Sequence, residues 1–134
     1  MSDLALQLIR ENKEKYVQGE DATYLNLSGL NLSGLNLNDY GLIELPTEIR
    51  DLKWLTRISL SNNQWFSNLT PLQDLMQLEE IYIYETQISD LSPLQNLPQL
   101  KRLYAYRTQI SDLSPLKNLS QLQQLDISSS LASD

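Results

Sequence analysis

Two consecutive stretches, "LEEIYIYETQISDLSPLQNLPQ" at 78–99 and "LKRLYAYRTQISDLSPLKNLSQ" at 100–121, are copies of one 22-residue unit. They share the run "TQISDLSPL" unchanged. An earlier copy occupies 55–77 with one extra residue, a 23-residue version fits 32–54, and a further copy begins at Leu122 and stops partway. Self-similarity at a fixed period of this length predicts a chain of stacked structural repeats.

The apolar positions within each unit indicate how the repeat folds. Alternate residues are apolar at the start of the unit, which predicts a short strand whose apolar side chains face inward. These inward pairs are Ile58 and Leu60, Ile81 and Ile83, Leu103 and Ala105, and Leu125 and Ile127. Leucines then recur every third residue, as a 3-10 or helical segment requires. The pattern predicts an α/β solenoid with a curved parallel sheet and short helical segments on its convex side.

Polar residues and prolines mark the turns of the unit. Ser92 before Pro93, and Ser114 before Pro115, are expected to act as N-cap hydroxyls with proline at the first helical position. The position after each strand is also polar, and its side chain is expected to hydrogen-bond the turning backbone from inside. These residues are Asn63, Thr86, Thr108 and Ser130.

The whole chain is expected to form a single domain, 1–134. Residues 1–21 would be an N-terminal capping helix and linker, with Leu4, Leu8 and Ile9 facing the first strand, because a solenoid end otherwise exposes its apolar layer. A first, stuttered repeat follows at 22–54, then repeats at 55–77, 78–99 and 100–121 and a truncated last repeat at 122–134. Deleting "NLSGLNLSGL" at 26–35 leaves an uninterrupted first repeat, although residues 25–44 also fit one coil of a pentapeptide-repeat solenoid.

Composition excludes several classes of function. The chain has neither Cys nor His, so thiolate sites, His-dependent triads and the usual zinc motifs are absent, and neither cofactor nor metal is expected. Its net charge of −7 leaves no basic face for nucleic acid or an anionic membrane. The first twenty residues lack the apolar stretch of a secretory signal, which favours the cytoplasm. Intrinsic catalysis is not expected.

The motifs "YLNLS" at 24–28, "LIELPTEIRDLKWLTRISLSNN" at 42–63 and two copies of "ISDLSPL" resemble those of bacterial leucine-rich-repeat proteins. The chain is similar both to internalin-type arrays and to the repeat segments that precede the GTPase of Roco proteins. It has no GxxxxGK[ST] loop, so the GTPase itself is not expected. The resemblance implies a protein-interaction module that uses its concave strand face.

The outward residues of the two best-matched repeats are the candidate binding site. Tyr82 and Tyr104 should stand side by side on neighbouring strands, as should Tyr84 and Tyr106, and form one exposed patch that binds a protein partner. Glu80, Glu85, Arg102 and Arg107 would frame it. Alternatively, the tyrosines are ordinary strand residues beside cross-strand ion pairs. A regulatory segment of a larger signalling protein, and a structural solenoid that self-associates through an uncapped C-terminal end, remain open.

Overall fold

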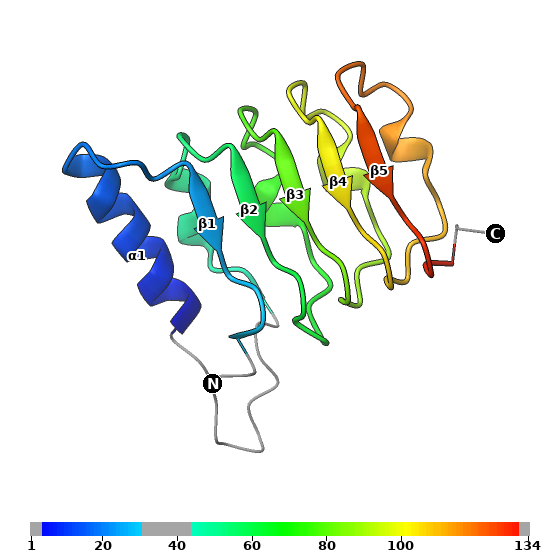
Figure 1. The fold of residues 1–134 in the computed structure, drawn as a ribbon, viewed down its shortest axis with the longest axis horizontal. Helices are drawn as coiled ribbons and strands as arrows, with labels where there is room; N and C mark the ends of the chain where they lie inside the picture. Colours follow the sequence, from blue (N-terminus) through cyan, green and yellow to red (C-terminus); the bar gives the residue numbers. More distant parts are fainter. Residues whose placement is uncertain (1–3, 31–43, 132–134) are drawn as a thin grey trace.

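The computed structural model describes residues 4–30 and 44–131 and shows a solenoid with one parallel sheet (Figure 1). The sheet has five strands in the order of the chain, one from each repeat. They are β1 (Tyr24–Asn26), β2 (Arg57–Ser59), β3 (Glu80–Tyr82), β4 (Arg102–Tyr104) and β5 (Gln124–Asp126). The predicted solenoid with a parallel sheet is therefore confirmed.

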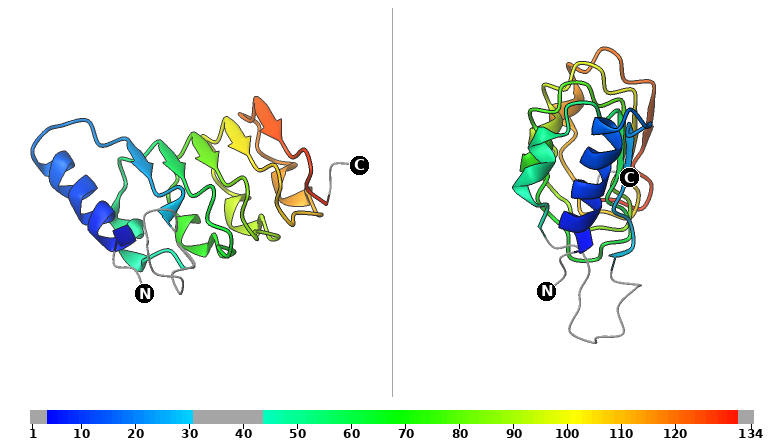
Figure 2. Two further views of the ribbon diagram at one scale, coloured as in Figure 1. Left: turned by 60° about the horizontal axis from the view of Figure 1, so that its bottom comes forward. Right: turned by 90° about the vertical axis from the view of Figure 1, so that its left-hand side faces the viewer.

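Short 3-10 segments form the opposite side of the solenoid (Figure 2). They are η2 (Thr47–Asp51), η3 (Thr70–Leu72), η4 (Ser92–Leu94) and η5 (Ser114–Leu116). Buried leucines recur every third residue through these segments, as at Leu91, Leu94 and Leu97, because a 3-10 helix returns to the same face every third residue.

The prediction that Ser92 and Ser114 are N-cap residues is wrong. Both serines are the first residue of their segment, and the preceding leucine occupies the cap position without a side-chain bond. The backbone N–H of Ser92 instead donates to Asp90 Oδ1 at 2.8 Å, and that of Ser114 to Asp112 Oδ1 at 2.9 Å. The short aspartate side chain reaches the amide two residues on, so a carboxylate satisfies the free donor at the start of each turn.

A continuous apolar layer lies between the strands and the 3-10 segments. The inward pair of β3, Ile81 and Ile83, and that of β4, Leu103 and Ala105, are fully buried. The polar residue after each strand closes the turn, as predicted. Thr86 Oγ1 donates to the Ile83 carbonyl and Thr108 Oγ1 to the Ala105 carbonyl, both at 2.8 Å. These bonds satisfy carbonyl groups that would otherwise be buried without a partner.

The strand register fixes the length of each repeat. Tyr82 pairs with Tyr104 after 22 residues, and Arg57 with Glu80 after 23. Tyr24 pairs with Arg57 after 33 residues, ten more than in the next repeat. This excess of ten residues equals the length of the tandem "NLSGLNLSGL". Most of the proposed pentapeptide coil falls in 31–43, outside the described residues, so the choice between the two interpretations stays a prediction.

Helix α1 (Leu4–Val17) covers the N-terminal end of the sheet (Figure 1). Its buried residues are Ala5, Ile9 and Asn12, while Leu4 and Leu8 are only partly buried against the core. Asn12 anchors the helix, because its amide donates to the Ala22 carbonyl at 3.0 Å and its Oδ1 accepts from Trp54 Nε1 at 2.7 Å. The helical stripe did not predict this polar anchor.

The C-terminal end of the sheet is less buried than its centre. Leu125 occupies the inward position of β5 but is 38% exposed, whereas its register partner Leu103 is 0% exposed. Both side chains face the same way, and the difference arises because no described strand lies beyond β5 to cover Leu125. Burial in this fold therefore depends on having a neighbour on both sides.

Substituting the two register partners should separate these environments. Leu103→Ala is expected to lower the free energy of unfolding by about 2–5 kcal/mol, because it leaves a cavity inside the stack. Leu125→Ala should cost about 1 kcal/mol or less, since much of that side chain already meets water. Urea denaturation of both variants measures the two costs, and equal costs would contradict the register.

The helix anchor gives a second stability prediction. Trp54→Phe removes the donor to Asn12 and leaves a buried amide oxygen unpaired, which should cost about 1–3 kcal/mol. The other tryptophan, Trp65, is 48% exposed, so Trp65→Phe is a matched control that should change stability by less than about 0.5 kcal/mol. If both variants melt like the unsubstituted protein, the bond to Asn12 does not hold the helix.

Candidate functional site

The outward side chains of the five strands form rows across the sheet, a surface called the strand face below. One row follows the first strand residues, and its members are Tyr24, Arg57, Glu80, Arg102 and Gln124. The next row is Asn26, Ser59, Tyr82, Tyr104 and Asp126. Parallel register thus brings together the tyrosines and charged residues that the sequence predicted to be neighbours.

The four candidate tyrosines form two stacked pairs. The ring centres of Tyr82 and Tyr104 are 4.9 Å apart with 10° between their planes. Those of Tyr84 and Tyr106 are 4.4 Å apart with 5° between their planes. These separations are close to the distance between neighbouring strands, so the sheet itself sets the stacking. Stacked aromatic pairs of this kind contribute about 0.5–1.5 kcal/mol beyond the area they bury.

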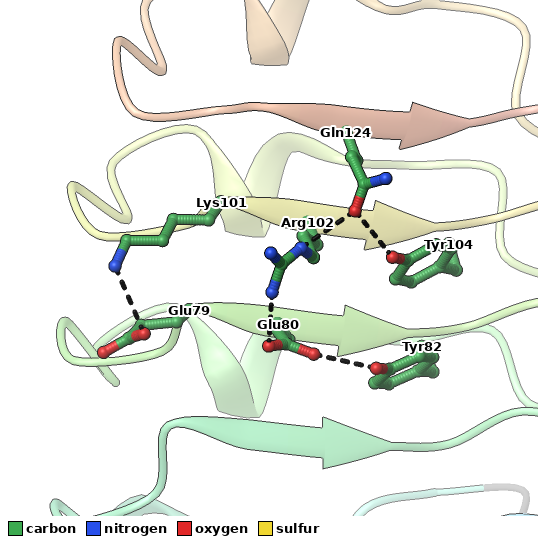
Figure 3. A network of polar contacts seen from close by, with 7 residues as sticks. All are labelled: Glu79, Glu80, Tyr82, Lys101, Arg102, Tyr104 and Gln124. Carbon is green, nitrogen blue, oxygen red and sulfur yellow. Dashed lines mark hydrogen bonds and ion pairs between the residues drawn. The ribbon is translucent and has the colours of Figure 1, made fainter.

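A polar network ties the first tyrosine pair to the charged row (Figure 3). Arg102 Nη1 donates to Glu80 Oε2 at 2.9 Å, and the Tyr82 hydroxyl donates to Glu80 Oε1 at 2.8 Å. Gln124 Oε1 accepts from both Arg102 Nε at 2.8 Å and the Tyr104 hydroxyl at 2.9 Å. Five side chains from three strands therefore hold one another in place.

This geometry differs from a simple exposed apolar patch. All four tyrosines are half-buried, and each ring turns one face toward its stacked neighbour. Ion pairing across the strands joins Glu80 to Arg102, the arrangement that the alternative interpretation expected. The strand face consequently presents ring edges, phenol groups and balanced charges. Exposed ion pairs of this kind add less than about 1 kcal/mol each to stability.

Glu85 and Arg107 lie in the turn after the strand rather than on the strand itself. Their φ angles are 56° and 55°, in the left-handed region, and Arg107 Nη1 lies 3.5 Å from Glu85 Oε2. Gly29 adopts the same conformation, with φ of 62°, at the corresponding turn after β1. Glycine is the usual residue for positive φ, so its alignment with Glu85 and Arg107 is a signal that would have placed both residues in a turn.

The turn residues also border a shallow, open hollow. It is lined by polar side chains from three successive repeats: Asn62, Gln64, Glu85, Thr86, Gln87, Arg107 and Gln109. The apolar pattern of the sequence does not predict this hollow, because its lining residues lie in turns rather than on strands.

The surroundings of Tyr82 and Tyr106 raise the pKa of these two phenols. Burial raises the pKa of Tyr82, and the hydrogen bond to the Glu80 carboxylate raises it further, since an ionised phenol would face that negative charge. Burial likewise raises the pKa of Tyr106, with charge repulsion from the Tyr84 phenol as the next cause. Both phenols stay neutral at physiological pH, and the Tyr82 hydroxyl donates to Glu80.

Neither a membrane span nor a metal site is found within 4–30 and 44–131. Helices in these ranges are too short and too polar to cross a bilayer. Carboxylate side chains in the same ranges do not gather in the groups of three or more that could hold a metal ion.

Comparison with known proteins agrees with this geometry. A family model described as leucine-rich repeats (2 copies) matches residues 77–118. No curated protein matches the chain. An internalin (inlF) of Listeria monocytogenes is 31% identical with a TM-score of 0.65, over 80% of this chain and 28% of its own. Internalin C2 of the same species is 38% identical with a TM-score of 0.61, over 66% of this chain and 39% of its own.

A leucine-rich-repeat protein of Leptospira interrogans is 27% identical with a TM-score of 0.61, over 66% of this chain and 23% of its own. The chain thus spans between 23% and 39% of the length of these three solved structures. Leucine-rich repeats of the bacterial type, predicted from the motifs, are confirmed by these matches.

The polar network predicts how Tyr82 titrates. Glu80→Gln should lower the raised pKa of Tyr82 toward its ordinary value of about 10, because the carboxylate charge is removed while the burial stays. Glu79→Gln is the matched control, since Glu79 pairs with Lys101 instead. NMR titration of the tyrosine ring carbons measures both effects.

The same shift has a consequence for stability. A folded-state pKa above the unfolded value means that Tyr82 contributes stability below pH about 10 and loses it as the pH rises through the folded pKa. Glu80→Gln should therefore reduce the loss of stability above pH about 10. An unchanged Tyr82 pKa in Glu80→Gln would show that burial alone raises it.

Proposed function

We propose that this leucine-rich-repeat domain is a protein-binding module whose partner docks on the strand face. Leucine-rich-repeat domains generally mediate protein–protein interaction. The observation that supports this site is the pair of tyrosine stacks at the centre of the sheet, with strands on both sides. We place the contact residues at Tyr82, Tyr84, Tyr104 and Tyr106, framed by Glu80, Glu85, Arg102 and Arg107.

Tyrosine is well suited to this role. It combines a large apolar ring with a polar end and loses little side-chain entropy on binding, and it is enriched among residues that dominate binding energy. Here the rings are already held by stacking and, for Tyr82 and Tyr104, by hydrogen bonds. A surface ordered before binding has less conformational freedom to lose, which favours affinity.

The charged residues contribute differently. Glu80 and Arg102 already satisfy each other, so a partner gains little by pairing with either. Arg107 makes a longer and more exposed contact with Glu85 at 3.5 Å. Charges in such a rim mainly orient the partner and set the association rate rather than the affinity.

Two further proposals concern the rest of the chain. We propose that residues 1–134 act as one domain, because one core cluster extends from Ala5 to Leu119. We also propose that it has no intrinsic catalysis, since leucine-rich-repeat domains are typically non-catalytic. A regulatory segment of a larger signalling protein, such as a Roco-type GTPase, is the alternative. Self-association at β5, where Leu125 and Leu131 are exposed, is a competing use of the module.

Replacing the tyrosines tests the docking surface. The variant Tyr82→Ala, Tyr84→Ala, Tyr104→Ala and Tyr106→Ala should keep its circular dichroism spectrum, because the inward layer is unchanged. It should lose its partner in a cross-linked pull-down from the source cells, since each anchoring ring contributes about 1–3 kcal/mol to binding.

The control removes exposed apolar side chains away from the strand face. Trp65→Ala with Met76→Ala has that property, and it should retain the partner. Loss of the partner in the control, but not in the tyrosine variant, would place the site on another side of the solenoid. A change in molar mass with concentration, measured by light scattering, would instead favour self-association.

A further inference from the structure

Two serines in the repeat that contains β2 show which way the tyrosine stacks lean. Ser59 lies in the row of Tyr82, and Ser61 follows it beside Tyr84, yet they are only 4% and 0% exposed. Tyr82 is the register partner of Ser59, and the Tyr84 N–H donates to Ser61 Oγ at 3.1 Å. The tyrosines of one repeat, Tyr82 and Tyr84, therefore cover the serines of the repeat before it.

Figure 3 shows the same displacement for both labelled rings: Tyr82 lies on the β2 side of its strand and Tyr104 on the β3 side of its strand.

The other end of each stack has no further ring against it, although Gln124 of β5 accepts from the Tyr104 hydroxyl at 2.9 Å. Asp126 is the register partner of Tyr104, and Ser128 follows beside Tyr106, because the Arg107 N–H donates to the Ser128 carbonyl at 3.0 Å. Ser128 is exposed and Asp126 is half-buried, so no large side chain covers them as the tyrosines cover β2. The ring faces of Tyr104 and Tyr106 thus form the wall of a step, and Asp126 with Ser128 forms its floor.

The floor of the step carries a negative charge. Asp126 Oδ1 accepts from the Ser128 hydroxyl at 2.7 Å and from the Ser128 N–H at 3.0 Å. These bonds hold the pKa of Asp126 below its usual range, so the carboxylate stays ionised near neutral pH. Among the described residues, the nearby arginines are paired elsewhere, Arg102 with Glu80 and Arg107 with Glu85. The second carboxylate oxygen of Asp126 has no partner in the described part of the chain.

We propose that this step binds an arginine side chain of the partner, an inference that rests on the proposed function. A guanidinium group is flat, so it can stack on the ring faces of Tyr104 and Tyr106 while its N–H groups donate to Asp126. The net charge of −7 also favours a basic segment. The same sheet contains this contact internally, because Arg57 Cζ lies 4.0 Å from the centre of the Tyr24 ring.

Lysine fits the step less well than arginine. Its ammonium group is compact and strongly hydrated, and it cannot both stack on a ring and form two parallel hydrogen bonds to a carboxylate. Citrulline has nearly the shape of arginine but no charge. The three side chains therefore separate shape from charge at one site.

The test titrates the protein with the amides of arginine, lysine and citrulline and follows the tyrosine ring signals by NMR. Arginine amide should shift the signals of Tyr104 and Tyr106 most. Lysine amide should bind at least about 3-fold more weakly, and citrulline amide about 10-fold more weakly. Equal binding of the arginine and citrulline amides would overturn the proposal.

Asp126→Asn tests the floor of the step without disturbing the turn. Asn26 Oδ1 already accepts from the N–H and hydroxyl of Ser28 at the equivalent position of the first repeat, so asparagine can replace the aspartate there. Asp126→Asn should weaken arginine amide at least about 5-fold. Asp112→Asn is the matched control, because Asp112 also accepts from a serine two residues later, and it should leave binding unchanged.

The outcomes separate this inference from the proposed function. Unchanged binding of arginine amide to Asp126→Asn would overturn the arginine site, while loss of the partner in the four-tyrosine variant would still support docking on the strand face. The protein could instead bind arginine amide selectively while its partner still binds the four-tyrosine variant. That result would leave the step as an arginine site and place the docking surface elsewhere.

Discussion

Stacking of apolar layers between neighbouring repeats is the interaction on which this structure depends. A single repeat is too thin to bury its own inward residues, so Ile81 is covered only because Ile58 and Leu103 lie on either side in register. The layer therefore needs a separate solution at each end. Helix α1 covers the N-terminal end, whereas Leu125 of β5 remains partly exposed.

The same stacking explains why the turns tolerate conformational cost. Asn62, Glu85, Arg107 and Ser129 all have positive φ, which costs a residue with a side chain about 1 kcal/mol. The chain accepts this because each strand must turn sharply at the same point for the layers to stay in register. The buried bonds from Thr86 and Thr108 to the strand carbonyls hold that turn from inside. The positive φ angles and the threonine bonds that hold the turns therefore recur once per repeat, as the leucines do.

The repeat period in the sequence predicts which residues pair on neighbouring strands. It does not predict contacts that depend on side-chain torsions or on how the helix packs. The alternation of apolar residues was sufficient to pair Tyr82 with Tyr104 and Glu80 with Arg102. It could not show that the rings stack or that Gln124 bridges Arg102 and Tyr104, because rotamers are not set by spacing. The bond between Asn12 and Trp54 joins residues 42 positions apart and depends on how helix α1 packs against the repeats. No local sequence pattern encodes that packing.

The division of labour between the two sides of each strand explains why the strand face can specialise. Inward positions must stay apolar, since neighbouring layers share them, but the outward positions contact only their row. Two adjacent repeats can therefore carry paired tyrosines while the repeats on either side carry smaller polar residues in the same rows. These are Ser59 and Ser61 on one side and Asp126 and Ser128 on the other. The stacks then end on small side chains, which leaves their two ends chemically different. On the β2 side the rings bury the serines, and on the β5 side a ring face meets an ionised carboxylate. The two ends of this surface therefore differ chemically, although similar repeats build it. A bound segment can be recognised in one orientation as a result.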